Sequence, residues 1–237
     1  MRSCLVVTLS SWLLNSSITG VLGQGRERDP PVSARAWEFI LGVTSLGISE
    51  YLRLNHPAPV SPELRAQVLA SLPAEGELVP TEAERTKLSA LDPILEFYRR
   101  RGTIEVRVVD VPYALVAIHG RAFLLITREA LSLVNAAELQ AIGAHELAHE
   151  LFWDDYDAAL KGEAYDRLQE LELRCDGIAV MTLRVLGLDP AHLARAAVKL
   201  IRYNEHLGGA LNMARQVSLG TRLAFIEKVH ALLRAKR

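Results

Sequence analysis

The sequence is poor in several features that mark specialised protein classes. Its 237 residues include only two cysteines, and no apolar run approaches the roughly 20 residues that a transmembrane helix needs. Lysine and arginine number 27 against 28 acidic residues, so no bulk charge draws the chain to nucleic acid or to acidic lipid. We therefore expect a globular protein with no nucleic-acid partner and no integral membrane domain in its mature chain.

The first 23 residues differ from the rest of the chain and have the layout of a secretory signal peptide. Arg2 gives a positive start, Leu5 to Leu14 is mostly apolar, and small residues near Gly23 suit a cleavage site. An uncleaved anchor or a buried N-terminal helix is the alternative. Removal of this segment would leave Cys175 as the only thiol, so no internal disulfide could form. The pattern predicts a periplasmic or secreted protein.

Beyond residue 23 the pattern predicts one α+β domain. Residues 24–33 are polar and contain prolines, as a linker would, and the domain is expected to cover 34–237, with a helical N-terminal part at 34–102. Helix periodicity and end signals predict helices at 34–55, 62–72, 81–101, 135–152, 160–186, 190–208 and 221–235, with an acidic loop at 153–157. The basic run Arg99 to Arg101 is expected to be a solvated helix end.

Between these helices the hydrophobic period changes to that of strands. Short apolar or alternating runs predict strands at 104–111, 113–118 and 122–127, with a hairpin at Gly120. The fold class is therefore α+β, mostly helical, with one small three-stranded sheet.

The strongest motif is His145-Glu146-Leu147-Ala148-His149, on a helix with an N-cap signal at Asn135. Histidines four residues apart project from one helix face, within reach of one metal ion. Glu146 lies about 100° further round the helix, where it can accept a proton from water without binding the metal itself. This spacing indicates a zinc site for hydrolysis. The alternative is that two surface histidines match this pattern by chance.

Such a site requires a third ligand, and Glu172 is the best candidate. It stands in an apolar context that suggests burial, and Asp176 follows it one turn later on the same helix face. A carboxylate there can orient a ligating histidine through its free N–H. The competing acids are expected to lie on solvated helix faces: Glu150, Glu163, Asp166 and Glu170.

Several stretches resemble the HtpX/Oma1-type family of zinc endopeptidases, which belongs to the gluzincins. They are Ala141–His149 (AIGAHELAH), Glu172–Val180 (ELRCDGIAV) and Leu186–Pro190 (LGLDP), preceded by Phe123–Thr127 (FLLIT), Ala130-Leu131 and Glu138-Leu139. The resemblance covers about residues 104–235. It implies a zincin-like metallopeptidase domain with its catalytic core at 103–237 and no multi-helix membrane part.

Carried over residue by residue, the resemblance makes His145, His149 and Glu172 ligands of one Zn²⁺. It makes Glu146 the general base and Asp176 a partner of the ligands.

Two departures from the family pattern matter. The family usually has alanine where this chain has Cys175, which we interpret as a small buried residue that could still lie close to the metal. The family also carries a His-Pro pair before an arginine, and no such pair precedes Arg222. The group that stabilises the transition state is therefore open among Arg222, His206 and Tyr203.

The function implied is zinc-dependent endopeptidase activity on unfolded or extended protein segments, in envelope or extracytoplasmic quality control. Zinc would polarise the scissile carbonyl, and Glu146 would accept a proton from water. The strand containing Phe123, Leu124 and Leu125 is expected to be a sheet edge that pairs with substrate backbone. The alternatives are a zinc-binding chaperone-like module and a latent protease homologue plugged by 153–160 or 204–216. A larger enzyme of thermolysin type fits the short chain less well. The sequence leaves the oligomeric state open.

Overall fold

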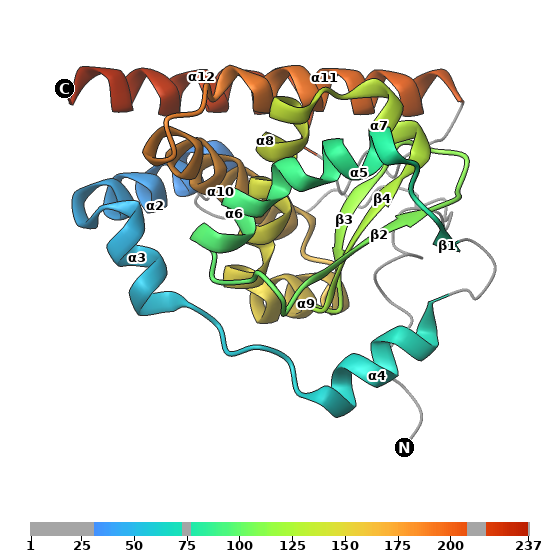
Figure 1. Ribbon diagram of the computed structural model, residues 1–237. Coiled ribbons are helices and arrows are strands. Elements are labelled where there is room, and N and C mark those ends of the chain that lie inside the picture. The colour runs from blue at the N-terminus through green and yellow to red at the C-terminus, as the bar shows by residue number, and fades with distance from the viewer. Residues whose placement is uncertain (1–30, 73–76, 208–216, 237) are drawn as a thin grey trace, which may run out of the picture.

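The computed structural model describes residues 31–72, 77–207 and 217–236 (Figure 1). The expected signal peptide and all but the last residues of the expected linker lie outside these ranges. The described chain is mostly helical with one small mixed sheet, so the α+β prediction is confirmed. No helix in this part of the chain is both long and apolar enough to cross a membrane.

The N-terminal part begins with three helices: α2 (Val32–Leu46), α3 (Ile48–Asn55) and α4 (Pro62–Ser71). The sequence predicts α2 and α3 as one helix, but Gly47 separates them with a φ of +87°, a conformation that glycine adopts without strain. α2 starts at Val32, inside the expected linker. In α4 the hydroxyl of Ser61 accepts a hydrogen bond from the amide of Leu64, and proline occupies the first helical position.

The predicted helix at 81–101 is three shorter elements: α5 (Glu82–Leu88), the 3₁₀ turn η1 (Ser89–Leu91) and α6 (Asp92–Phe97). The capping box predicted at its start is confirmed, because Thr81 and Glu84 exchange side-chain to backbone bonds. After α6 the chain turns at Arg99, whose φ is +53°. This turn directs Arg100 into the protein, so the expectation of a fully solvated basic run is wrong.

The sheet contains the three predicted strands and one short addition, in the order β1-β2-β4-β3. β2 and β4 are parallel, whereas β1 with β2 and β3 with β4 are antiparallel. The strands are β1 (Glu77–Leu78), β2 (Glu105–Val109), β3 (Val116–His119) and β4 (Phe123–Thr127). The hairpin predicted at Gly120 joins β3 to β4, and Gly120 has a φ of +55°.

The prediction that Phe123, Leu124 and Leu125 form an edge strand is wrong. β4 pairs with β2 on one side and with β3 on the other, and every residue of β4 is buried. The unbroken apolar run is typical of a strand covered on both faces and both edges. Within the described chain, the edge on this side of the sheet is β3.

Six further helices and one 3₁₀ turn follow the sheet. They are α7 (Arg128–Leu133), α8 (Ala136–Ala148), η2 (His149–Phe152), α9 (Trp153–Lys161), α10 (Tyr165–Val185), α11 (Ala191–His206) and α12 (Leu219–Ala235). The expected acidic loop at 153–157 is therefore the start of a helix. Asp154 and Asp155 lie in its first turn, where negative charge favours the helix dipole.

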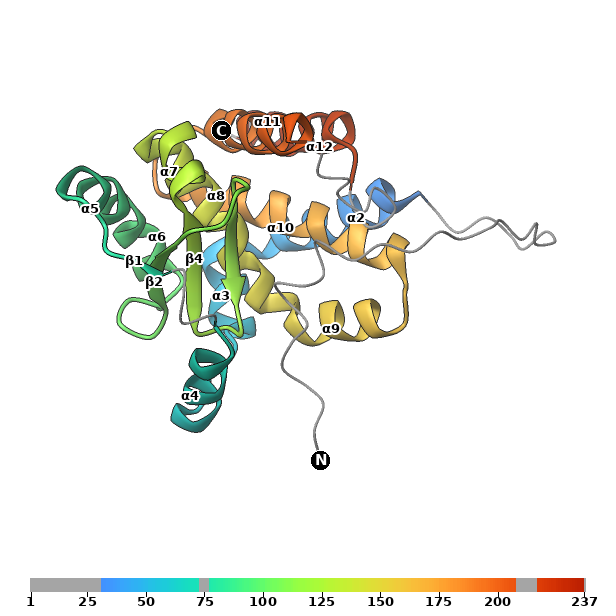
Figure 2. The same cartoon turned by 90° about the vertical axis from the view of Figure 1, so that its right-hand side faces the viewer.

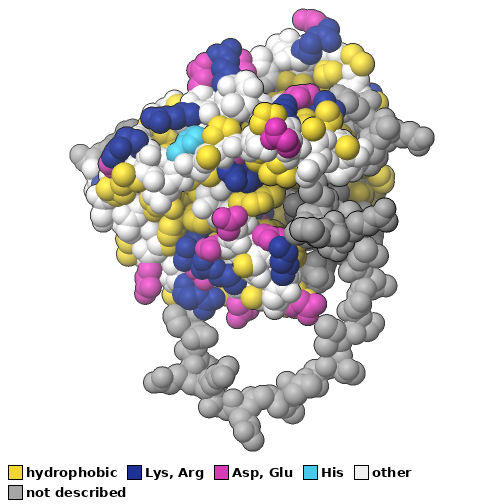
Figure 3. All heavy atoms as spheres, turned by 90° about the horizontal axis from the view of Figure 1, so that it is seen from below, with side chains coloured by type: hydrophobic (Ala, Val, Ile, Leu, Met, Phe, Trp, Pro, Cys, Tyr) yellow, Lys and Arg dark blue, Asp and Glu magenta, His cyan; other side chains and the backbone are white. Residues whose placement is uncertain are grey.

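α10 is the central helix of the molecule, and it packs against α2, α8 and α12 (Figure 2). Gly177 allows α2 to come close, because a Cβ there would lie 2.2 Å from the side chain of Ile40. The main core joins these helices to one face of the sheet, while α4 covers the other face through Val68. Seen from below, acidic and basic side chains lie interspersed on the surface, as the small net charge leads us to expect (Figure 3).

Candidate metal centre

The three residues of the H-E-x-x-H motif lie in the last turn of α8 and at the start of η2. The side chain of Asn135 accepts a hydrogen bond from the amide of Glu138, and Glu138 reciprocates, so the helix start is fixed by a capping box. At its other end the helix tightens into η2, and the two imidazoles lie with Nε2 atoms 3.3 Å apart. His145, Glu146 and His149 form a group whose donor atoms can hold one metal ion.

Glu172 reaches the same point from α10. One carboxylate oxygen lies 3.4 Å from Nε2 of His145, and the other lies 3.6 Å from Nε2 of His149. Zinc–ligand bonds of about 2.0–2.1 Å in a tetrahedral site put neighbouring donor atoms roughly 3.3–3.4 Å apart. The separations therefore fit zinc, and two imidazoles with a carboxylate are a donor set that zinc accepts.

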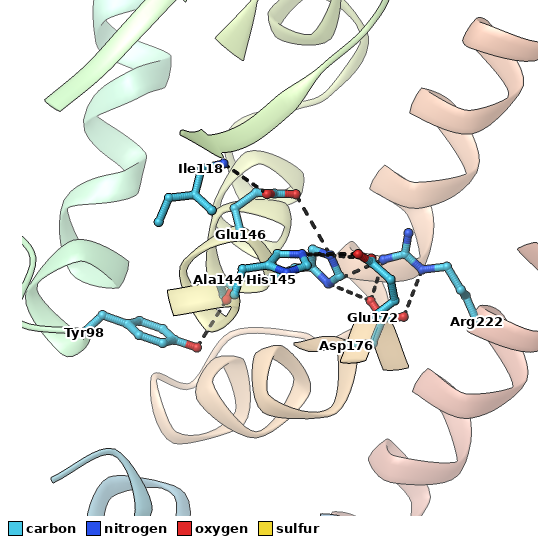
Figure 4. Close-up of polar contacts among 9 residues, drawn as sticks. Tyr98, Ile118, Ala144, His145, Glu146, Glu172, Asp176 and Arg222 are labelled. Carbon is cyan, nitrogen blue, oxygen red and sulfur yellow. Dashed lines mark hydrogen bonds and ion pairs between the residues drawn. The ribbon is translucent and has the colours of Figure 1, made fainter. Parts of the chain in front are cut away.

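Glu146 also has a carboxylate near this point, but it is held differently. Its Oε1 lies 4.0 Å from Nε2 of His145, further than either oxygen of Glu172 lies from its nearest imidazole nitrogen. Its Oε2 accepts a hydrogen bond of 3.2 Å from the amide of Ile118 on β3 (Figure 4). Of the two carboxylates, that of Glu172 thus lies closer to the imidazole nitrogens, and that of Glu146 is held by the backbone of β3.

Asp176 and Arg222 lie behind His145. Nδ1 of His145 is 2.9 Å from Asp176, and the guanidinium of Arg222 donates two hydrogen bonds of 2.9 and 2.6 Å to the same carboxylate (Figure 4). Burial favours neutral groups, but the Asp176 carboxylate outweighs it and raises the pKa of Arg222 above its usual range. A proton on Nδ1 of His145 satisfies Asp176, so Nε2 is the nitrogen that faces His149 and Glu172 and would bind a metal once it has released its own proton.

Burial shifts the acid–base properties of the whole group. It lowers the pKa of His149 to about 4 and raises the pKa of Glu146 to about 7. Burial alone would lower the pKa of His145, but the carboxylates of Asp176 and Glu172 raise it to about 10. At neutral pH His149 is therefore a neutral imidazole, His145 without a metal is protonated, and the pKa of Glu146 lies near the value that suits a general base.

The candidate residues for transition-state stabilisation fall in different places. Arg222 belongs to the site, but its guanidinium is engaged by Asp176 and lies 3.4 Å from Nδ1 of His145, on the side away from the metal-binding nitrogens. Tyr203 is half-buried against the main core, and His206 is exposed at the end of α11. Among the described residues, no hydrogen bond or ion pair joins Tyr203 or His206 to the metal-binding group. Part of the proposed plug, 208–216, lies outside the described ranges.

Other residues of the site carry no sequence signal. The ring of Tyr156 stands edge-on to His149 at a centroid distance of 5.4 Å, in a helix where the sequence indicates a loop. The hydroxyl of Tyr98 donates to the carbonyl of Ala144 and contacts the hydroxyl of Thr182, which ties α8 to α10 just before His145 (Figure 4). Cys175 is fully buried as expected, and burial raises the pKa of its thiol.

Two of the four acids that the sequence offers as alternatives to Glu172 are buried rather than solvated. Glu163 and Asp166 are exposed, but Glu150 is 4% exposed and Glu170 is 2% exposed. Both are paired with arginines rather than with imidazoles. Their burial therefore has a structural cause, and neither belongs to the metal-binding group.

Comparison with known proteins does not assign the chain to a family. No protein-family model, curated protein or solved structure matches the chain. The resemblance to the HtpX/Oma1-type endopeptidases stays a prediction that rests on its motifs. What the structure supplies is the group His145, Glu146 and His149, of which His145 is buried and the other two are partly buried, and this group can hold a metal ion.

Proposed function

We propose that the protein is a zinc-dependent endopeptidase of the HtpX/Oma1 type. The observation that carries the proposal is the set of donor separations of 3.3, 3.4 and 3.6 Å among His145, His149 and Glu172. The last two distances run to the two different carboxylate oxygens of Glu172, and all three are close to the donor separation of a tetrahedral zinc site, in which three protein ligands would leave a fourth position for water or substrate. A second carboxylate, that of Glu146, lies beside this open position and is not needed as a ligand.

Each residue of the group has a distinct task in this proposal. His145, His149 and Glu172 hold the ion, and Asp176 fixes the tautomer of His145. When bound, zinc supplies a Lewis acid that polarises the peptide carbonyl and makes water more acidic. Glu146 accepts the proton of the attacking water on its carboxylate and delivers it to the leaving amine.

Substrate would bind along β3 rather than β4. In the part of the chain that the structure describes, β3 has a strand partner on one side only, and its Ile118 amide donates to Glu146. An extended peptide that pairs with this strand would pass the metal-binding group with its backbone. Backbone pairing selects unfolded or extended segments more than particular side chains. With the signal-peptide pattern at the N-terminus, this favours protein quality control in the periplasm or outside the cell.

Zinc content and casein cleavage, measured on the full chain and on Glu146→Gln, test the proposal. We expect one zinc per chain in both proteins and a loss of cleavage of about 10²–10⁴-fold in the variant, because only the proton acceptor is removed. Glu227→Gln, the same change at an exposed position of α12, is the matched control and keeps full activity.

The same experiment separates the alternatives. Zinc bound without cleavage by either protein would contradict the peptidase proposal and favour a binding module or a latent protease. Cleavage that survives in Glu146→Gln would contradict the role of Glu146. Absence of zinc from every form would contradict the metal centre itself.

A further inference from the structure

The edge of β3 that faces away from β4 has no strand partner among the described residues, and its backbone groups follow a fixed pattern. Leu115 stands opposite Thr127, whose amide donates to the Leu115 carbonyl at 2.9 Å. In an antiparallel pair, residues alternate between bonding the neighbouring strand and pointing away from it. The amides and carbonyls of Ala114, Val116 and Ile118 therefore point away from β4, toward the side where a substrate strand would lie.

The two ends of this edge are different. At one end, the amide of Ile118 donates to Glu146, so this end adjoins the proposed catalytic base. At the other end, the amide of Ala114 donates to Oδ1 of Asn204 at 2.8 Å, and Nδ2 of Asn204 donates to the carbonyl of Ala114 at 2.9 Å. Both backbone groups of Ala114 are thus bonded by one side chain.

The carboxamide of Asn204 reproduces what a paired strand would offer. A carboxamide carries a carbonyl acceptor and an N–H donor, as a peptide unit does. By bonding both groups of Ala114, it occupies the position that the backbone of a bound peptide would need in order to continue along β3. The groups left for pairing are the amide and carbonyl of Val116 and the carbonyl of Ile118, because the Ile118 amide is bonded to Glu146.

Asn204 is also held firmly enough to act in this way. It lies on α11, which packs into the main core through Leu193, Ala196 and Leu200. Lys199, on the same helix, donates to Glu138 at 2.7 Å and so ties α11 to the start of α8. The carboxamide is therefore fixed relative to the helix that carries the metal-binding group.

We propose that Asn204 caps the substrate-binding edge and limits backbone pairing to both backbone groups of Val116 and the carbonyl of Ile118. This inference rests on the proposed peptidase function. A peptide that bonds to these two alternate residues pairs over roughly three of its own residues, and further extension past Ala114 adds no pairing. Asn204 is in this sense a specificity-determining residue, which favours substrates that present a short extended segment.

The test is peptide binding as a function of peptide length, measured by fluorescence anisotropy. The proteins are the zinc-loaded full chain with Glu146→Gln, to prevent turnover, and the same chain with Asn204→Ala added. The probes are labelled peptides lengthened one residue at a time from either end. Asn55→Ala in the same background is the matched control, because the Asn55 side chain is exposed and bonds only within α3 among the described residues.

With Asn204 present, we expect affinity to stop rising with length at one end of the peptide. In Asn204→Ala, further residues at that end should tighten binding by roughly 1.5- to 5-fold each time a new pair forms. An unchanged plateau overturns the inference. So does equal weakening for all lengths, which would show that Asn204 only supports the Ala114 segment. Failure of every peptide to bind contradicts the proposed function as well, whereas the other two failures leave it standing.

Discussion

Two kinds of carboxylate lie near the metal-binding histidines: Glu150 and Glu170 are buried, and Glu172 is 19% exposed. Glu150 adjoins His149 in η2, and Glu170 precedes Glu172 by two residues in α10. Glu150 pairs with Arg100 at 2.5 Å, and Arg121 lies 3.5 Å away. Glu170 is bonded by the side chains of Arg35, Arg167 and Arg174.

Glu172 has no ion pair with an arginine or lysine among the described residues. Its near neighbours are the Nε2 atoms of His145 and His149, at 3.4 and 3.6 Å. The comparison teaches how to tell a structural acid from a metal ligand on one helix. An arginine keeps its charge at every physiological pH and cannot bind a metal, whereas an imidazole can release its proton and share a metal ion with the neighbouring acid.

The largest expected effect is the loss of zinc when Glu172, and not Glu170, is replaced by glutamine. Glu172→Gln removes a ligand and should abolish stoichiometric zinc binding, with a loss beyond the roughly 10–100-fold expected for an outer partner. Glu170→Gln, the matched change two residues away, should keep zinc and lower only the melting temperature. Inductively coupled plasma mass spectrometry and a thermal melt measure both. Equal zinc loss in the two variants would contradict the distinction between a structural acid and a metal ligand.

A second prediction concerns the stability of the Glu150 pair. Both side chains of this pair are 3% exposed or less, so Glu150→Gln should reduce the unfolding free energy by about 3–5 kcal/mol by leaving Arg100 without its charged partner. Urea denaturation measures the change. The double variant Arg100→Met with Glu150→Leu should recover most of the loss, because paired apolar replacements remove both charges. A double variant less stable than Glu150→Gln would argue against this explanation.

A smaller effect is expected from the carboxylate behind His145. Asp176→Asn keeps the shape but removes the charge that holds the His145 tautomer, so zinc affinity should fall about 10–100-fold. Competition with a chelating dye measures this affinity. An unchanged affinity would mean that Asp176 serves only to neutralise Arg222.

The smallest effect should come from Arg222. Arg222→Met leaves the bond between His145 and Asp176 in place, and we expect zinc affinity to fall by less than about tenfold. Arg222→Lys, which keeps the charge without the two parallel bonds, should fall between Met and the wild type. A loss in Arg222→Met larger than that in Asp176→Asn would show that the arginine acts on the metal by another route.

The sequence predicts well what depends on neighbours along the chain. The spacing of His145, Glu146 and His149, the capping boxes at Thr81 and Asn135, and the three strands all follow from local patterns. Glu172 lies beside the imidazoles as its apolar context and helix position led us to expect, but its side chain is 19% exposed, so burial did not distinguish it from the other acids.

What the sequence does not predict depends on distant partners. The parallel pairing of β2 with β4 makes β4 central, and nothing in either strand alone specifies it. Arg100 and Glu150 are 50 residues apart, so the sequence does not show that they pair. Without a visible partner, each charged side chain is expected to be exposed to solvent. The amide of Ile118 reaches Glu146 only because the hairpin places β3 at the edge.

X-ray absorption at the zinc edge, on the zinc-loaded full chain, tests the central claim most directly. The account predicts one zinc per chain with nitrogen and oxygen neighbours at about 2.0–2.2 Å and two imidazole signatures. The signal should vanish in Glu172→Gln and persist in Glu170→Gln. A sulfur neighbour at about 2.3 Å would place Cys175 on the metal and contradict the ligand set, and so would zinc that survives the loss of Glu172 unchanged.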